Sequence, residues 1–167
     1  MDEKLLDESS IIIRKGKKDD FDQVAEIWVQ TIEWHAEFDK EFQLDPDGRN
    51  NFIFVLNTAI SDPSQVVYVA LQSNSVIGFV YGYIKKQIGF FQRQVVAHIS
   101  DIAIKEEFRK KGVGRALMRR FENDFAKKNN ADSLSLYVHI SNDEGMNFYR
   151  KLGFYEKLVS MRKKITY

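Results

Sequence analysis

Hydrophobic positions along the chain follow two periods, and each period predicts a different kind of element. In residues 19–38 the apolar side chains recur every three or four positions, which is typical of an amphipathic helix. Residues 49–60 follow the same rule and stop at the turn Ser61-Asp62-Pro63, so a second helix is expected there. Runs rich in β-branched and aromatic residues instead predict strands, at residues 11–16, 65–72, 75–86 and 94–104.

Helical spacing returns after the fourth of these strands, over residues 112–128. The buried stripe of this helix is expected to carry Val113, Leu117, Arg120, Phe121 and Phe125. Apolar and polar residues then alternate over residues 132–140, which predicts a strand. Residues 142–153 are expected to form a short helix that ends at a glycine, and residues 154–167 a last strand.

The order of these elements, β-α-α-β-β-β-α-β-α-β, predicts the class of fold. The polar turn between residues 65–72 and 75–86 makes those two strands a hairpin. A hairpin-rich first half is followed by two βα units, so the sheet should contain both antiparallel and parallel strand pairs. We therefore expect one α/β (α+β) domain over residues 1–167, with a central mixed, mostly antiparallel sheet flanked by helices on both faces.

Composition narrows the classes of function. A hydrophobic content of 44% with 13% aromatic residues predicts a folded globule. The formal net charge of +1 creates no whole-molecule field for nucleic acid or an acidic membrane, so any anion site must be local. Because the chain has no cysteine, disulfides, thiolate metal sites and a cysteine nucleophile are excluded. The acidic N-terminus and the lack of a long apolar run predict a cytoplasmic protein without membrane contact.

The segment FRKKGVGRALMRRFENDF, residues 108–125, crowds positive charge before a Gly-x-Gly that opens a helix. The first four N–H groups of a helix have no acceptor within the helix, and the macrodipole adds roughly half a positive charge there. Gly112 and Gly114 allow the backbone to approach a ligand closely. Four basic side chains add local charge, namely Arg109, Lys110, Lys111 and Arg115. The segment therefore predicts a nest for a phosphate or a diphosphate.

Three phosphate-binding patterns compete for this segment. A P-loop requires Lys and Ser or Thr after its last glycine, where this chain has Arg115 and Ala116. A Rossmann turn requires a third glycine or alanine at the position of Leu117, and a shorter path from the preceding strand. The third pattern is Arg/Gln-x-x-Gly-x-Gly/Ala between a strand and a helix. Residues 109–114 fit it at each defined position.

Two stretches carry a resemblance to a known family. HISDIAIKEEFRKKGVGRALM (98–118) and LYVHISNDEGMNFYRKLGF (136–154) together resemble the acetyl-CoA-binding core of the GCN5-related N-acetyltransferase (GNAT) superfamily. The resemblance covers about residues 66–165 in motif and the whole chain in the order of elements. It implies a GNAT fold and an N-acetyltransferase in which a primary amine attacks acetyl-CoA directly in a ternary complex, without a metal. One departure is Gly145, where the family often has alanine.

The resemblance also assigns cofactor-binding residues. The diphosphate of coenzyme A is expected on backbone N–H groups of Arg109, Lys110, Lys111, Gly112, Val113, Gly114 and, by extension, Arg115. The pantetheine arm is expected to pair like an extra strand with the backbone of Ile102, Ala103 and Ile104. Asn142 matches a family asparagine that contacts the cofactor. Capping of the helix that begins at Asp143 is its alternative role.

Tyr149 is the candidate general acid. It matches the family tyrosine near the coenzyme A sulfur, whose phenol can donate a proton to the departing thiolate. The alternative is a packing role between Phe148 and Phe154. The oxyanion donor implied by the family is a backbone N–H near Ile102.

Three candidates remain for the general base. On an unbroken strand His98 would share one face with Ser100, Ile102 and Ile104, and its imidazole has a pKa near the working pH. Asp101 is the main alternative, and it would reach the cleft only if a β-bulge shifts the register. A chain of water molecules is the third candidate, and His139 on the neighbouring strand could take part in it.

The acceptor is expected to be a small-molecule amine or the amine of a peptide or protein, and a homodimer is left open. In this fold the acceptor pocket is framed by residues 28–42, the loop around Phe90 and Phe91, and residues 153–160. Acidic side chains in the first of these segments could attract a cation, but we interpret them as a solvated helix face: Glu33, Glu37, Asp39 and Glu41. Trp28 and Trp34 are interpreted as core residues.

Two other classes of function compete with an enzyme. A non-catalytic regulatory module could keep the coenzyme A site without performing transfer, although a tyrosine at 149 and a polar strand face favour catalysis. A nucleic-acid-binding module would need a basic face. The balanced charge and the acidic pair Glu106 and Glu107 beside the basic loop speak against nucleic acid as a partner.

Overall fold

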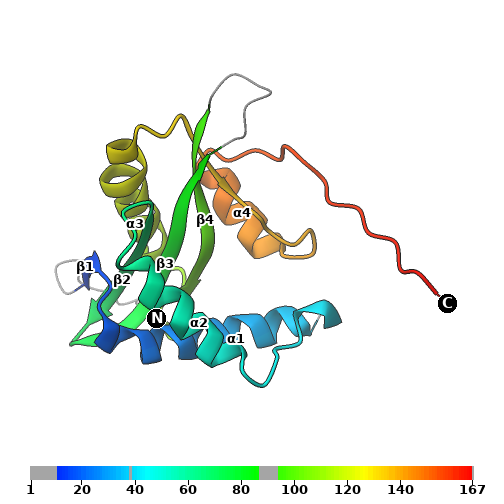
Figure 1. The fold of residues 1–167 in the computed structure, drawn as a ribbon, viewed down its shortest axis with the longest axis horizontal. Coiled ribbons are helices and arrows are strands. Elements are labelled where there is room, and N and C mark those ends of the chain that lie inside the picture. Colours follow the sequence, from blue (N-terminus) through cyan, green and yellow to red (C-terminus); the bar gives the residue numbers. More distant parts are fainter. Residues whose placement is uncertain (1–10, 38, 87–93, 167) are drawn as a thin grey trace, which may run out of the picture. The chain divides into compact units, whose positions relative to one another are not determined.

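The computed structural model describes residues 11–37, 39–86 and 94–166 (Figure 1). The chain divides into two compact units, Met1–Tyr137 and Val138–Tyr167, and each is described by itself. The helices and strands of the first unit are β1 (Ile11–Lys15), α1 (Phe21–Ala36), α2 (Gly48–Ala59), β2 (Gln65–Gln72), β3 (Ser75–Lys86), β4 (Val95–Ile104), α3 (Val113–Phe121) and β5 (Ser133–Leu136). The second unit contains α4 (Asp143–Lys151).

The five strands form one sheet in the order of the chain, β1-β2-β3-β4-β5. Neighbouring strands pair antiparallel except β4 and β5, which pair parallel because α3 connects them. The hairpin between β2 and β3 turns through Ser73 and Asn74, both with positive φ (49° and 64°), as its tight connection requires. The predicted mixed, mostly antiparallel sheet is therefore confirmed.

Each face of the sheet packs against its own helices (Figure 1). The face covered by α1 and α2 carries a core that includes Val24, Ile27, Phe52, Leu56, Val67, Val69, Phe79 and Tyr81. On the opposite face α3 packs close to the backbone at Gly82. A Cβ atom at Gly82 would lie 2.3 Å from the carbonyl oxygen of His98 and 2.7 Å from the ring of Phe121. Only glycine fits where β3, β4 and α3 come this close.

The helix expected over residues 112–128 is present in three parts. The α-helical part ends at Phe121, and a π-helical turn (Glu122–Ala126) and a 3-10 turn (Lys127–Asn129) follow. The apolar members of the predicted stripe are buried, but Arg120 is exposed. Its guanidinium lies 5.9 Å from the ring centroid of Tyr68 and pairs with Asp124 at 2.7 Å. The prediction was thus wrong for Arg120, because a guanidinium stays at the surface while its aliphatic stem covers apolar groups.

Two strand predictions in the last third of the chain were wrong. The strand expected over residues 132–140 ends at Leu136, and His139 instead closes a turn in which its carbonyl oxygen accepts from the N–H of Asn142 at 2.9 Å. The described residues 154–166 form no strand, and several of their large apolar side chains are exposed. An alternating pattern makes a strand only where a neighbouring strand completes its hydrogen bonds.

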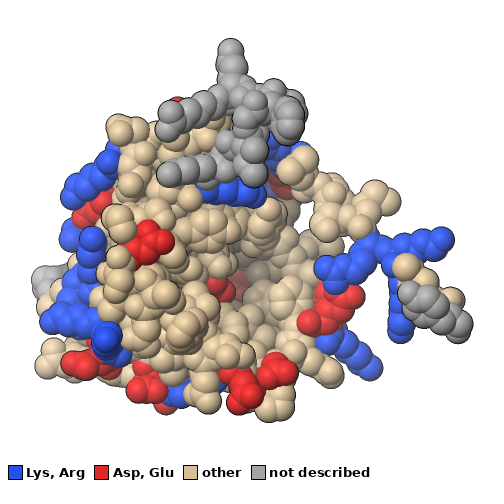
Figure 2. Space-filling model, in the orientation of Figure 1, with Lys and Arg blue, Asp and Glu red and all other residues tan. Residues whose placement is uncertain are grey.

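On the side of the molecule drawn in Figure 2, Lys and Arg side chains lie among Asp and Glu side chains. In the part of the chain that the structure describes, no helix combines the length and the apolar character that a membrane crossing requires.

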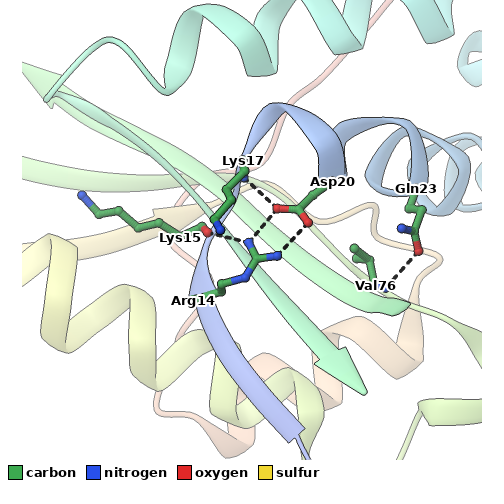
Figure 3. A network of polar contacts seen from close by, with 6 residues as sticks. All are labelled: Arg14, Lys15, Lys17, Asp20, Gln23 and Val76. Carbon is green, nitrogen blue, oxygen red and sulfur yellow. Dashed lines mark hydrogen bonds and ion pairs between the residues drawn. The ribbon is translucent and has the colours of Figure 1, made fainter. Parts of the chain in front are cut away.

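A partly buried ion pair joins the end of β1 to the start of α1 (Figure 3). Both guanidinium nitrogens of Arg14 donate to the carboxylate of Asp20, at 2.7 and 2.8 Å, and the N–H of Lys17 donates to the same carboxylate at 2.7 Å. Asp20 is only 6% exposed. The Arg14 hydrogen bonds hold the pKa of the Asp20 carboxyl below its ordinary value, although burial acts in the opposite direction.

Replacing Asp20 with asparagine should lower the free energy of unfolding by about 2–3 kcal/mol at neutral pH, because Arg14 loses its charged partner. A carboxyl whose pKa is lowered by folding stabilises the protein above its unfolded-state pKa, and this stabilisation is lost as the pH falls through the folded-state pKa. The difference between wild type and Asp20→Asn should therefore shrink below about pH 4. Urea denaturation at several pH values measures it, with the exposed neighbour Asp19→Asn as control.

Candidate active site

The strand β4 contains a β-bulge at Ser100. Asp101 stands opposite Tyr81 and Ile99 stands opposite Gly82, so Ser100 has no partner in the register with β3. The unbroken strand on which His98 and Ser100 would share a face is therefore absent, and the bulge that the Asp101 alternative requires is present. His98 pairs with Tyr83, so His98 and Asp101 both point to the face that α1 and α2 cover.

Asp101 is held at this bulge by two hydrogen bonds. Its Oδ1 accepts from the indole Nε1 of Trp28 at 2.9 Å, and its Oδ2 accepts from the hydroxyl of Ser100 at 2.7 Å. Burial raises the pKa of the Asp101 carboxyl, whereas these two hydrogen bonds and the nearby charge of His35 oppose the rise. The result is a partly buried carboxylate with a raised pKa, as a general base requires.

His98 lies deeper, with only 4% of its surface exposed. Its Nδ1 is 2.9 Å from the hydroxyl oxygen of Ser135 on β5, and its ring packs against Tyr83 and Tyr137 with centroids 5.2 and 5.0 Å away. Burial lowers the pKa of the His98 imidazole, and the charge of Lys85 adds to this. His98 is therefore neutral at physiological pH and is packed between strands.

Beyond Ile99 one edge of β4 is open. The parallel pairing with β5 covers only Val96 to Ile99, and no other described strand pairs with β4 on that side. Alternate N–H and C=O groups of residues 100–104 therefore face this edge. The carbonyl oxygen of Ile104 already accepts from Nε of Arg109 at 3.2 Å. The edge leads from the carboxylate of Asp101 toward the start of α3.

The start of α3 forms a nest of backbone N–H groups. Lys110 and Gly112 have positive φ (60° and 85°), and this turns the chain into the helix. Among the described residues, no backbone carbonyl accepts a hydrogen bond from the amides of residues 110–115. A Cβ atom at Gly112 would meet nothing within 4 Å, so space lies open beside this turn. Residues 109–115 therefore offer the donors, the charge and the room that an anion needs.

The comparison with protein families identifies the chain. The model of the Acetyltransferase (GNAT) family matches residues 26–154. The chain belongs to the GNAT family.

Related proteins and solved structures agree with this membership. An N-alpha-acetyltransferase of Saccharolobus solfataricus is 28% identical over 152 residues, which are 85% of this chain and 78% of that relative. A mutant of the BH1408 protein from Bacillus halodurans has a TM-score of 0.80 at 21% identity, covering 93% of this chain and 99% of that one. AAC(6')-Iy in complex with the bisubstrate analogue CoA-S-monomethyl-acetylneamine has a TM-score of 0.73 at 16% identity, with coverage of 93% and 99%. GNAT enzymes use acetyl-CoA, and this chain is an N-acetyltransferase.

The remaining GNAT residues lie in the second unit. Asn142 caps α4, because its Oδ1 accepts from the N–H of Gly145 at 2.8 Å, and the capping role is thereby confirmed. A Cβ atom at Gly145 would lie 2.7 Å from the Asn142 side chain, which gives a local reason for glycine at this position. Tyr149 packs edge-on against Phe148 and Phe154, with ring centroids 5.3 and 5.8 Å away. A cofactor contact of Asn142 and an acid role of Tyr149 stay predictions.

The segment expected to frame the acceptor is partly as predicted. Trp28 is a core residue and stacks on Phe52, but Trp34 is 36% exposed, so the core interpretation was wrong for Trp34. The acidic side chains Glu33, Glu37 and Glu41 are exposed, as the solvated-face interpretation expects, whereas Asp39 is half-buried. Phe90 and Phe91 lie outside the described residues, and residues 153–160 belong to the second unit.

Sequence reasoning missed two hydrogen-bond partners at this candidate site. Ser135, the partner of His98, follows only from the register of β4 and β5. The bond from Trp28 could have been expected in part, because a tryptophan on the core side of a helix has an indole N–H that requires a hydrogen-bond acceptor. Within the described part of the chain, no three His, Asp or Glu side chains are grouped as a metal site would require.

Proposed function

We propose that this N-acetyltransferase transfers the acetyl group of acetyl-CoA to the α-amine of a peptide or protein N-terminus, by direct attack of the amine. One observation carries the proposal. The open edge of β4 runs between a partly buried carboxylate, Asp101, and a nest of backbone amides at residues 110–115. The name of the Saccharolobus solfataricus relative, N-alpha-acetyltransferase, supports the choice of acceptor. A small-molecule amine and a lysine side chain are the alternatives.

The residues at the start of α3 fit a diphosphate. The unbonded amides can donate to its oxygens, and the side chains of Arg109, Lys110, Lys111 and Arg115 add charge. The open space beside Gly112 leaves room for the group. The backbone of Ile102, Ala103 and Ile104 would pair with the pantetheine arm, as an added strand pairs with an open edge. When bound, acetyl-CoA supplies the thioester whose acetyl group is transferred.

Asp101 is the proposed general base. The incoming amine must lose a proton to attack, and an N-terminal amine has a pKa of about 7.7–8.0 against about 10.4 for lysine. About a quarter of an N-terminal amine is already neutral near pH 7.4, but only about a thousandth of a lysine side chain. A carboxylate with a raised pKa therefore suits the α-amine better. His98 and a water chain are the alternative bases.

A peptide panel tests the choice of acceptor. Acetyl-CoA turnover is followed by release of free thiol with three peptides: a free N-terminus without lysine, a blocked N-terminus with lysine, and both groups blocked. A panel of small amines completes the set. We expect thiol release only with the free N-terminus. Release with the lysine peptide or with small amines alone would contradict the proposal, and tight coenzyme A binding without any release would indicate a regulatory module.

Tyr149→Phe should lower kcat by about 10²-fold or more while leaving the affinity for coenzyme A nearly unchanged, because it removes only a proton donor. Steady-state kinetics and calorimetric titration with coenzyme A measure the two quantities. Tyr68→Phe is the matched control, because it carries the same chemical change on β2, where the ring lies against Arg120 of α3. An unchanged kcat in Tyr149→Phe would leave Tyr149 with its packing role alone.

A further inference from the structure

Trp28 makes a contact that its place in the core does not explain. Its ring stacks on Phe52 with centroids 4.2 Å apart and planes 12° apart, as a core aromatic residue would. A buried indole N–H needs an acceptor, and any backbone carbonyl could serve. The acceptor here is instead a carboxylate 73 residues away, Oδ1 of Asp101 at 2.9 Å. Helix α1 therefore reaches directly to the bulge of β4.

We propose that Trp28 is a positioning residue for the general base, and that its indole N–H orients the Asp101 carboxylate and keeps it ionised in partly buried surroundings. The inference rests on the proposed function, in which Asp101 accepts the amine proton. The stack on Phe52 fixes the indole, so α1 and α2 together determine where Oδ1 lies. Ser100 acts on Oδ2 from within the bulge, at 2.7 Å.

Both oxygens of Asp101 can still accept the proton of an amine. A carboxylate has about four lone-pair sites, and the donors from Trp28 and Ser100 occupy two of them. Each donor can bond to the ionised form, so each favours that form. The structure therefore supplies a base that is held in place without being neutralised by an ion pair.

Other groups around Asp101 act in known directions. On α1, the charge of His35 lowers the pKa of the Asp101 carboxyl, as the two hydrogen bonds do, whereas burial raises it. On β3, Tyr81 stands opposite Asp101, but its hydroxyl donates to the side-chain oxygen of Gln65 at 2.7 Å. Loss of the Trp28 N–H would therefore leave burial less opposed and raise the pKa of Asp101 further.

The experiment removes the N–H and keeps the ring. Trp28→Phe retains an aromatic ring to stack on Phe52, and β-(3-benzothienyl)alanine at position 28 replaces the N–H with sulfur at nearly constant shape. The ratio of variant to wild-type kcat/KM is measured from pH 5 to 9 with the free-N-terminus peptide, so that titration of the acceptor cancels. In the protein without substrate, the carboxyl carbon of Asp101 is titrated by NMR, and Asp101→Asn assigns its signal.

We expect the ratio to fall about tenfold from the neutral plateau to the acid limb. The reason is that loss of one hydrogen bond to a charged group raises the pKa of that group by about one unit. The midpoint of the Asp101 carbon should move to higher pH in the same variants. Thr58→Val is the control on α2: it removes a hydroxyl that donates to the carbonyl oxygen of Phe54 at 2.7 Å, and it should show a flat ratio because that bond does not involve Asp101.

Two results would overturn the inference, and they are distinguishable. A flat ratio together with an unmoved carbon midpoint would make Trp28 a core residue only, while the proposed function would stand if Asp101→Asn were inactive. Full activity of Asp101→Asn would instead remove the proposed base itself. If Trp28→Phe does not fold, the benzothienyl variant decides the same question.

Discussion

Gly112→Asp should weaken coenzyme A binding by more than about 100-fold. Gly112 has a φ of 85°, which strains any residue with a side chain, and its amide belongs to the proposed diphosphate nest. A carboxylate about 4 Å from a phosphate oxygen is repelled by about 4 kcal/mol near a protein surface, and each 1.4 kcal/mol is a tenfold change in affinity. Calorimetric titration with coenzyme A measures the loss.

Two further variants separate the causes. Gly112→Ala adds the strain without the charge, and a Cβ atom there meets no neighbour, so its loss of affinity should be much smaller. Asn130→Asp adds the same charge at the opposite end of this helical segment, at a residue that also has a positive φ (52°). This variant should bind coenzyme A as the wild type does. Unchanged affinity in Gly112→Asp would show that the diphosphate binds elsewhere.

Asp101→Asn should lower kcat by roughly 10²–10⁴-fold while coenzyme A still binds, because it removes the proposed proton acceptor and leaves the nest intact. The fold should tolerate the change, since an amide oxygen can still accept from Trp28 and an amide N–H₂ can donate to Ser100. In the wild-type enzyme, kcat/KM should fall as the pH drops through the pKa of Asp101, which burial raises. The acid limb should thus lie at a higher pH than the ordinary pKa of an aspartate would give.

His98→Gln is the comparison that decides between the two candidate bases. His98 on β4 is buried and bonded to Ser135 on β5, so its replacement should alter stability more than the chemical step. A larger loss of kcat in His98→Gln than in Asp101→Asn, steepest at acidic pH, would assign the base to His98 instead. Thermal unfolding of both variants separates loss of fold from loss of chemistry.

Much of the fold could be predicted because its determinants are local. Apolar spacing predicts α1 and α2, and the short polar turn predicts the β2–β3 hairpin, where Ser73 and Asn74 accept positive φ. The turn before α3 is equally local. Its glycines and basic residues lie within seven positions, and the structure gives positive φ to Lys110 and Gly112 there. Helix starts and tight turns depend on neighbours in sequence, so a single chain reveals them.

Other features depend on partners that are distant in sequence. A strand needs an adjacent strand, so alternation alone predicted too much at 132–140 and at 154–167. The bulge at Ser100 lies where β3 and β4 approach closely at Gly82, and it turns Asp101 rather than Ser100 to the α1 face. No periodicity within β4 contains that information.

The sequence by itself determined the order of the elements, the class of sheet and the position of the anion-binding turn, because propensity, spacing and turn chemistry act over a few residues. Only the tertiary structure decided which side chain of β4 faces α1, which hydrogen bonds fix that side chain, and where the pairing of β4 with β5 ends. Those outcomes depend on register and on contacts such as Trp28 to Asp101, and strand pairing across the whole sheet determines them.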